Sequence, residues 1–243
     1  MISYFLIFIS LLIFLFPKNS TKNDENHIYL LLFFSFSFSH LILGFISLLI
    51  IYLNITSFPI LLISILVLLI SLIINKKILL KLSTILNFIS SEINKTFYQN
   101  KNYPFQKFLL YIILFITFLI FISSIGPINH PDASDYHVGY PYQYFIRGGF
   151  FVDGGFHQGL VGIADYANLS FIQEKNTWFI RTLQIINLPI LILFLSNKVK
   201  NNIFLLGLIS CPTFIQWSTI GKPLFLGESC LIATYILWKI NKS

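Results

Sequence analysis

Residues 105–125 read FQKFLLYIILFITFLIFISSI, and Gly126 and Pro127 follow directly. A bilayer core about 30 Å thick needs about 20 predominantly apolar residues in a helix to cross it. The stretch has that length, and its one charged residue, Lys107, lies close to its start. The sequence therefore predicts a transmembrane helix over residues 105–125, ended by the Gly-Pro pair.

The rest of the chain repeats this pattern. Of the 243 residues, 56% are hydrophobic and 10% are charged, with a mean hydropathy of +0.80. Soluble domains carry about 25% charged residues, and disordered chains have low hydrophobicity, so both classes are excluded. We predict an all-α, polytopic integral membrane protein that forms one transmembrane domain over residues 1–243. Its seven predicted transmembrane helices are residues 2–17, 28–53, 58–75, 105–125, 177–196, 202–220 and 224–238.

The basic residues indicate how these helices are oriented. Twelve of the 16 Lys and Arg residues lie in connections that share one side if seven spans alternate: Lys18, Lys22, Lys76, Lys77, Lys81, Lys95, Lys101, Lys107, Lys198, Lys200, Lys239 and Lys242. The positive-inside rule places that side in the cytoplasm. The net charge of +7 therefore indicates orientation in a membrane, and we expect membrane lipids and no nucleic acid as partners. We predict a bacterial inner membrane, with residues 126–177 in the periplasm.

Residues 76–104 are too polar to be a span. Apolar residues recur every three or four positions, with polar residues mostly between them. The apolar positions are Ile78, Leu82, Ile85, Ile89, Ile93 and Phe97, and Glu92 falls among the polar ones. This period predicts an amphipathic interfacial helix on the cytoplasmic surface; a cytoplasmic linker is the alternative.

Acidic residues gather in residues 126–177, which we name the acidic segment. It holds five of the nine acids: Asp132, Asp135, Asp153, Asp165 and Glu174. A loop of this length exceeds what a connection needs, and functional groups are common in loops on a rigid frame. We expect the segment to be partly helical and to carry the functional site.

The acidic segment begins with GPINHPDASDYH at residues 126–137. If Pro131 opens a helix, Asp132 and Tyr136 share a face at the mouth of the bundle. A carboxylate there could take a proton from a hydroxyl nucleophile or bind a cation. A divalent metal is a possible cofactor, since carboxylate and imidazole groups suit several such ions. The candidate ligands are His130, Asp132, Asp135 and His137.

Three further residues are candidates outside this motif. Arg147 precedes two glycines, and Lys222 is the only charged residue between the last two spans, so either could bind a phosphate group. The alternatives are a plain turn at Arg147 and an interfacial lysine at position 222. Glu228 lies within a predicted span, where a carboxylate is costly. We expect it to face the bundle interior or to pair with Lys222 or Arg181.

The pattern Asp132, Tyr136, His137 and Pro141 resembles the first outer loop of the GT-C-fold glycosyltransferases. The resemblance covers residues 126–230. The most similar members are the bacterial relatives of protein O-mannosyltransferases and of lipid A aminoarabinose transferases. These polytopic enzymes use polyprenyl-phosphate-linked sugars. Asp165-Tyr166 is similar to a second acid-Tyr pair of that family, and Lys222-Pro223 to a later Lys-Pro-Asp motif whose acid is replaced by Leu224 here.

The resemblance implies a function and a set of roles. The chain would move a sugar from a polyprenyl-phosphate donor to an acceptor on the outer side of the membrane. Asp132 would activate the acceptor hydroxyl, and Asp165 and His137 would position donor or acceptor. The substrate-binding candidates are Tyr136, Arg147, Lys222 and Glu228. Because members of the family have more spans, we expect a truncated or minimal member, which a partner subunit could complete.

A transporter or a non-catalytic membrane subunit is the competing hypothesis. Glu228 and Arg181 would then mark a polar pathway through the bundle. Transporters commonly contain repeated halves or broken helices, and the sequence shows no repeat.

Overall fold

The computed structural model describes residues 1–15, 25–74, 78–99, 103–127, 133–152, 154, 158, 161–199, 202–219 and 224–242. Every regular element within these ranges is a helix, so the all-α prediction is confirmed. In chain order they are α1 (Ile2–Leu15), α2 (Glu25–Tyr52), α3 (Ile60–Ile74), α4 (Ile78–Gln99), α5 (Pro104–Ser124), η1 (Ala133–His137), α6 (Gly139–Arg147), α7 (Ile163–Tyr166), α8 (Asn168–Gln173), η3 (Thr177–Phe179), α9 (Ile180–Gln184), α10 (Leu188–Val199), α11 (Asn202–Ser210), α12 (Pro212–Thr219) and α13 (Leu224–Lys242).

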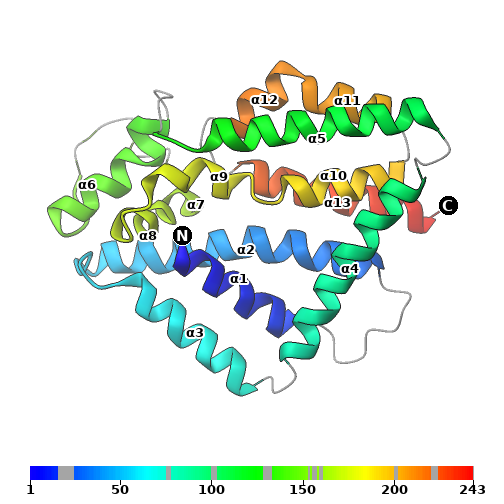
Figure 1. The fold of residues 1–243 in the computed structure, drawn as a ribbon. Helices are drawn as coiled ribbons and strands as arrows, with labels where there is room; N and C mark the ends of the chain where they lie inside the picture. The colour runs from blue at the N-terminus through cyan, green and yellow to red at the C-terminus, as the bar shows by residue number, and fades with distance from the viewer. Residues whose placement is uncertain are drawn as a thin grey trace.

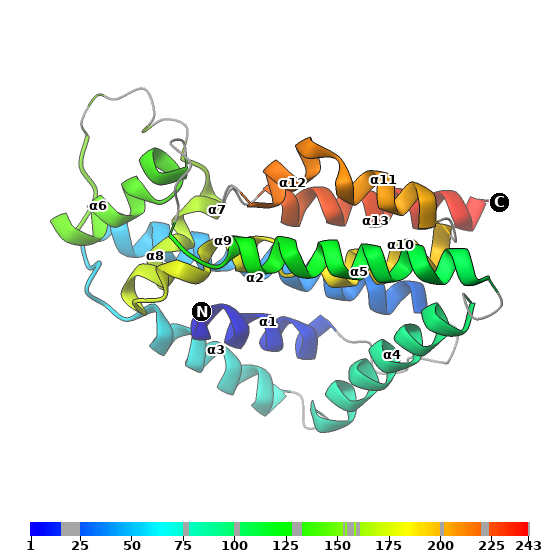
Figure 2. The same ribbon diagram turned by 45° about the horizontal axis from the view of Figure 1, so that its top comes forward.

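The longer helices form a bundle with two distinct ends (Figure 1). Helices α2, α5, α10 and α13 run side by side, while α1 and α3 pack along one flank of the bundle (Figures 1 and 2). The short helices of the acidic segment, α6, α7 and α8, gather at the end near the N-terminus. Helix α4 and the C-terminus lie toward the opposite end, so this end contains the predicted cytoplasmic helix.

Among the described residues, three helical stretches are long and apolar enough to cross a membrane: Asn26–Tyr52, Pro104–Ser124 and Thr177–Lys198. Three further apolar helices are shorter, at Ile2–Leu15, Ile60–Ile74 and Leu226–Trp238. The structure thus supports a helical membrane protein, whereas the count of seven crossings stays a prediction.

Two predicted spans are interrupted. Residues 202–220 were expected to form one helix, but α11 ends at Ser210 and α12 begins at Pro212. Proline has no backbone N–H and disfavours helical geometry in the residue before it, so a helix breaks readily at this point. The stretch Thr177–Lys198 stays helical overall, but a tighter turn at residues 185–187 separates α9 from α10 within it.

Helix α1 is held at both ends by side chains from distant segments. The Glu174 carboxylate accepts hydrogen bonds from the backbone N–H groups of Ile2 and Ser3, at 2.7 and 2.9 Å. At the other end, the buried Lys81 ammonium donates to the carbonyl oxygen of Ile13 at 3.0 Å. A helix leaves unpaired N–H groups at its start and unpaired carbonyls at its end. A carboxylate and an ammonium therefore satisfy the two ends of α1 with the charges that each end favours.

Helix α4 confirms the predicted helical period but turns a different face to the bundle. Its buried positions are Lys81, Ile85, Phe88, Glu92 and Thr96, which share one face at helical spacing. The predicted apolar face includes Ile93 and Phe97, and these are 42% and 36% exposed. The placement of Glu92 on the polar face was wrong: this residue is 1% exposed, because partners on α2 and α10 satisfy its carboxylate.

Candidate functional site

The close approach of α7 to α2 sets the position of the site. A Cβ atom built on Gly44 of α2 would lie only 2.0 Å from the carbonyl oxygen of Ile163, the first residue of α7. Only glycine leaves room for α7 at this distance. His40 lies one turn earlier on the same face of α2 and is 2% exposed. It interacts electrostatically with Asp165 of α7, so a glycine contact brings a histidine and a carboxylate together.

The central contact of the site joins His137 to Asp165. The His137 Nδ1 atom lies 2.6 Å from Asp165 Oδ1, and both side chains are almost fully buried. The other carboxylate oxygen, Oδ2, accepts a hydrogen bond of 2.8 Å from the backbone N–H of Gly162, which caps the first turn of α7. Because both oxygens of Asp165 have hydrogen-bond donors, the carboxylate has a fixed orientation within the acidic segment.

Asn168 and Tyr166 contact the residues that surround the His137–Asp165 pair. The fully buried Asn168 donates from Nδ2 to the carbonyl oxygen of His137 at 2.8 Å. The Tyr166 ring stacks on Tyr144 of α6, with 6.2 Å between centroids. Burial, followed by the nearby Tyr144 hydroxyl, raises the pKa of Tyr166 to about 12. The Tyr166 hydroxyl therefore keeps its proton at neutral pH and acts as a neutral polar group.

A cavity of about 230 Å³ opens beside the His137 turn. It is lined by Pro127, Ser134, Val138, Gly139, Tyr142, Thr177 and Trp178. Trp178 and Tyr142 are 60% and 49% exposed, so two aromatic rings border the cavity. A hydrogen bond of 3.0 Å from the Gly126 N–H to the Trp178 carbonyl closes the two ends of the acidic segment together. The cavity therefore lies where the segment meets the bundle.

The arrangement suits proton handling and the orientation of a polar ligand. A hydrogen-bonded carboxylate and imidazole can hold a proton in a defined place and keep the imidazole in one orientation. His40 adds a second imidazole near the same carboxylate. Since all three side chains are buried, the electrostatic interactions among them are screened less than on an open surface.

Several predicted site residues lie outside the described residues. These are Asp132, His130 and Lys222, and for Tyr136 only the backbone is described. Asp135 is exposed, whereas His137 is buried against Asp165. Within the described part of the chain, no group of three or more His, Cys, Asp or Glu side chains could hold a metal ion. Because His130 and Asp132 lie outside the described residues, the metal set of His130, Asp132, Asp135 and His137 stays a prediction.

The remaining candidates lie in different surroundings. The Arg147 guanidinium lies over the Phe151 ring, 3.8 Å from its centroid, which is a cation–π contact. Arg181 is buried in α9, with its guanidinium close to Gly126. Glu228 is partly buried and lines a separate cavity of about 220 Å³ between α10, α11, α12 and α13. The structure thus brings together His137 and Asp165 from the predicted set, and it places Arg147 and Glu228 elsewhere.

Sequence analysis missed His40, Gly44 and the role of Asn168. His40 and Gly44 lie one helical turn apart inside an apolar span, where polar residues are rare and usually have a partner within the bundle. A histidine and a glycine at this spacing inside an apolar span therefore indicated a contact with another segment. Asn168 follows the Asp165-Tyr166 pair, and nothing in the sequence indicates that it contacts the backbone of His137.

Comparison with known proteins gives no match to a family model, to a curated protein or to a solved structure.

Proposed function

We propose that the chain is a membrane glycosyltransferase that uses a polyprenyl-phosphate-linked sugar. In this proposal seven helical segments cross a bacterial inner membrane, with the lysine-rich connections in the cytoplasm and the acidic segment in the periplasm. The division of the bundle into an end with the acidic segment and an end with α4 and the C-terminus supports this topology (Figure 1).

The observation that carries the proposal is the buried His137–Asp165 pair beside the cavity bordered by Tyr142 and Trp178. A sugar ring presents apolar C–H faces and polar edges. Aromatic rings suit the faces, and a few placed polar groups beside a pocket suit the edges. The cavity of about 230 Å³ accommodates part of a glycosyl group rather than a whole lipid-linked donor.

The proposed reaction is a displacement at the anomeric carbon. Asp132 takes the proton from an acceptor hydroxyl, and the acceptor oxygen forms the new bond to the anomeric carbon. The bond from that carbon to the phosphate oxygen breaks, and polyprenyl phosphate leaves with the electron pair. Lys222 stabilises the charge on the departing phosphate. The His137–Asp165 pair orients the donor or the acceptor next to Asp132, which lies five residues before His137 in the chain.

Sugar transfer in isolated membranes tests this function. Wild-type protein is compared with Asp132→Asn, Asp165→Asn and His137→Gln, using a panel of radiolabelled polyprenyl-phosphate sugars. We expect transfer by the wild type, loss with Asp132→Asn, and a reduction of about 10²-fold or more with the other two, because misplaced reacting groups cost about that much. Gln143→Ala is the control, since its side chain is exposed on α6 and has no part in the proposed site.

Equal expression and helix content are checked for each variant. Transfer that persists at wild-type rates in Asp132→Asn and Asp165→Asn would remove both residues from the mechanism. Absence of transfer by the wild type across the donor panel would overturn the enzyme proposal and favour a transporter or a non-catalytic subunit.

A further inference from the structure

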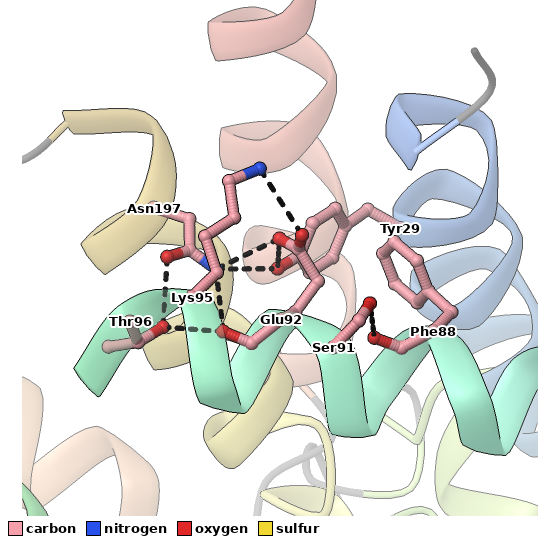
Figure 3. A network of polar contacts seen from close by, with 7 residues as sticks. All are labelled: Tyr29, Phe88, Ser91, Glu92, Lys95, Thr96 and Asn197. Atoms are coloured by element: carbon pink, nitrogen blue, oxygen red, sulfur yellow. Dashed lines mark hydrogen bonds and ion pairs between the residues drawn. The ribbon is translucent and has the colours of Figure 1, made fainter. Parts of the chain in front are cut away.

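A buried polar cluster joins α4 to the bundle at the end opposite the acidic segment. Glu92 of α4 accepts hydrogen bonds from the Tyr29 hydroxyl at 2.7 Å and from the Asn197 Nδ2 atom at 2.9 Å. Asn197 Oδ1 in turn accepts from the Thr96 hydroxyl at 2.9 Å. Figure 3 shows these side chains converging from α2, α4 and α10. The cluster therefore clamps α4 against the bundle.

Lys95 connects this cluster to the surface. Its ammonium lies 3.3 Å from Glu92 Oε1, and its side chain is 39% exposed while that of Glu92 is 1% exposed. In Figure 3 the Lys95 side chain rises above the Glu92 carboxylate. The carboxylate holds the ammonium at the border between the buried cluster and solvent, so the position of this positive charge is well defined.

A shallow groove of about 770 Å³ runs between α4 and α5 at this border. Its lining residues are Ser91, Asn94, Lys95, Phe97, Tyr98, Lys107 and Tyr111. The set contains two lysines and no carboxylate, and its other polar members are hydroxyl or amide groups. Lys107 extends over the Tyr111 ring, 5.9 Å from the centroid. The groove is therefore complementary to an anion that also presents hydrogen-bond acceptors.

An apolar cavity of about 250 Å³ adjoins the groove, and Phe97 lines both. Its walls come from α4, α5 and α10 and include Ile93, Leu110 and Leu193, with only three hydroxyl side chains among its lining residues. One of these, the Ser196 hydroxyl, is buried without a hydrogen-bond partner in the described part of the chain. An apolar cavity in a membrane protein suits a hydrocarbon chain, while the groove beside it suits a charged group.

We propose that the groove and the cavity together bind one anionic phospholipid. Its phosphate lies between Lys95 and Lys107, its glycerol and ester oxygens face Asn94 and the tyrosines, and one acyl chain enters the apolar cavity along Phe97. Charge complementarity selects an anionic head group over a zwitterionic one, because a choline or ethanolamine group would add a cation beside the two lysines. The site is separate from the proposed glycosyltransferase site and does not depend on it.

Native mass spectrometry of the full chain in detergent tests the proposal. The probes are phosphatidylglycerol and phosphatidylcholine with identical acyl chains. We expect the wild type to retain one phosphatidylglycerol in preference to phosphatidylcholine. Lys107→Gln should weaken phosphatidylglycerol binding by about fivefold, the effect of removing one lysine near an anionic lipid. Lys198→Gln is the matched control, because Lys198 lies on α10 outside the groove.

Ser196→Leu tests the acyl-chain part of the site. Leucine at this position fills the cavity and removes the unpartnered hydroxyl, so retention of phosphatidylglycerol should fall while helix content stays the same. Millimolar inorganic phosphate should fail to displace the lipid. Equal retention of the two lipids, equal binding by Lys107→Gln and Lys198→Gln, or displacement by phosphate would each overturn the proposal. Unchanged binding by Ser196→Leu would overturn the placement of the chain in the cavity.

Discussion

The α-carbon of Gly44 faces the carbonyl of Ile163 so closely that a Cβ atom would lie 2.0 Å from its oxygen. This contact joins α2, a helix long and apolar enough to cross a membrane, to the first residue of α7. It sets the depth at which Asp165 enters the bundle, and with it the distance from Asp165 to His40 and His137. The site therefore depends on the absence of a single methyl group.

Gly44→Ala should displace α7 and destabilise the protein by about 1–3 kcal/mol, the usual effect of overpacking. The obstacle is backbone, which cannot rotate away as a side chain can. Thermal and denaturant unfolding in detergent measures the change. Gly207→Ala is the control, since nothing lies within 4 Å of its Cβ position in α11. It should be neutral or stabilising by up to about 1 kcal/mol, because alanine favours helices. Equal stability of the two variants would contradict the prediction.

Asn168→Ala should loosen the His137 turn. The substitution leaves the buried carbonyl of His137 without its hydrogen bond from Nδ2, which costs about 1–3 kcal/mol of unfolding free energy. Hydrogen exchange should show faster exchange in residues 133–142 than in the wild type. Gln143→Ala, an exposed amide in α6, serves as the control. Unchanged exchange in Asn168→Ala would show that other contacts hold the turn.

The stability of α1 should depend on pH through Glu174. Burial pushes the pKa of Glu174 upward, but hydrogen bonds from the Met1 ammonium and from Ser3 outweigh it and hold the pKa below its usual value of 4.5. Because the pKa of Glu174 is lower in the folded protein than in the unfolded chain, its carboxylate stabilises the fold fully above pH 4.5. This stabilisation is lost as the pH falls through the pKa that Glu174 has in the folded protein. Unfolding midpoints between pH 7 and pH 3 should drop for the wild type. They should drop less for Glu174→Gln, which is already weakened at pH 7.

Tyr29→Phe should destabilise the protein by about 1–3 kcal/mol, because it removes one of the donors to a buried carboxylate and leaves the shape of the ring intact. Tyr52→Phe, in which the side chain is 75% exposed at the end of α2, is the matched control and should be neutral. Denaturant unfolding of both variants in the same detergent measures the difference. A wild-type midpoint for Tyr29→Phe would mean that the remaining donors suffice for Glu92.

The main helices could be predicted because their signal is local. The apolar runs over residues 28–53 and 105–125 correspond to α2 at Glu25–Tyr52 and α5 at Pro104–Ser124. The interruptions could not be predicted from hydropathy, since an apolar run continues across them. A proline nevertheless lies at each interruption: Pro212 is the first residue of α12, and Pro189 follows the turn at residues 185–187. Proline is a more direct sign of a broken helix than the surrounding hydrophobicity.

The contacts of the site were predicted only in part, because the residues that touch are far apart in the sequence. His137 and Asp165 were selected as candidates by residue type and segment, and they touch across 28 positions. His40 lies in a different helix, and Asn197 lies 105 positions from Glu92. Periodicity assigned Glu92 to the polar face because a pattern on one helix contains no information about partners on another. Pairing across helices decides which polar residue is buried.

The turn at residues 185–187 places the amino end of an α-helix inside the span, because α10 begins at Leu188. The aligned peptide dipoles of α10 give this end a partial positive charge within the apolar stretch Thr177–Lys198. Leu191, in the first turn of α10, lines the same cavity as Glu228, and Asn187 contacts the Ser229 hydroxyl next to it. The interruption thus places the amino end of α10 beside the cavity that Glu228 of α13 lines, where the helix dipole favours a carboxylate.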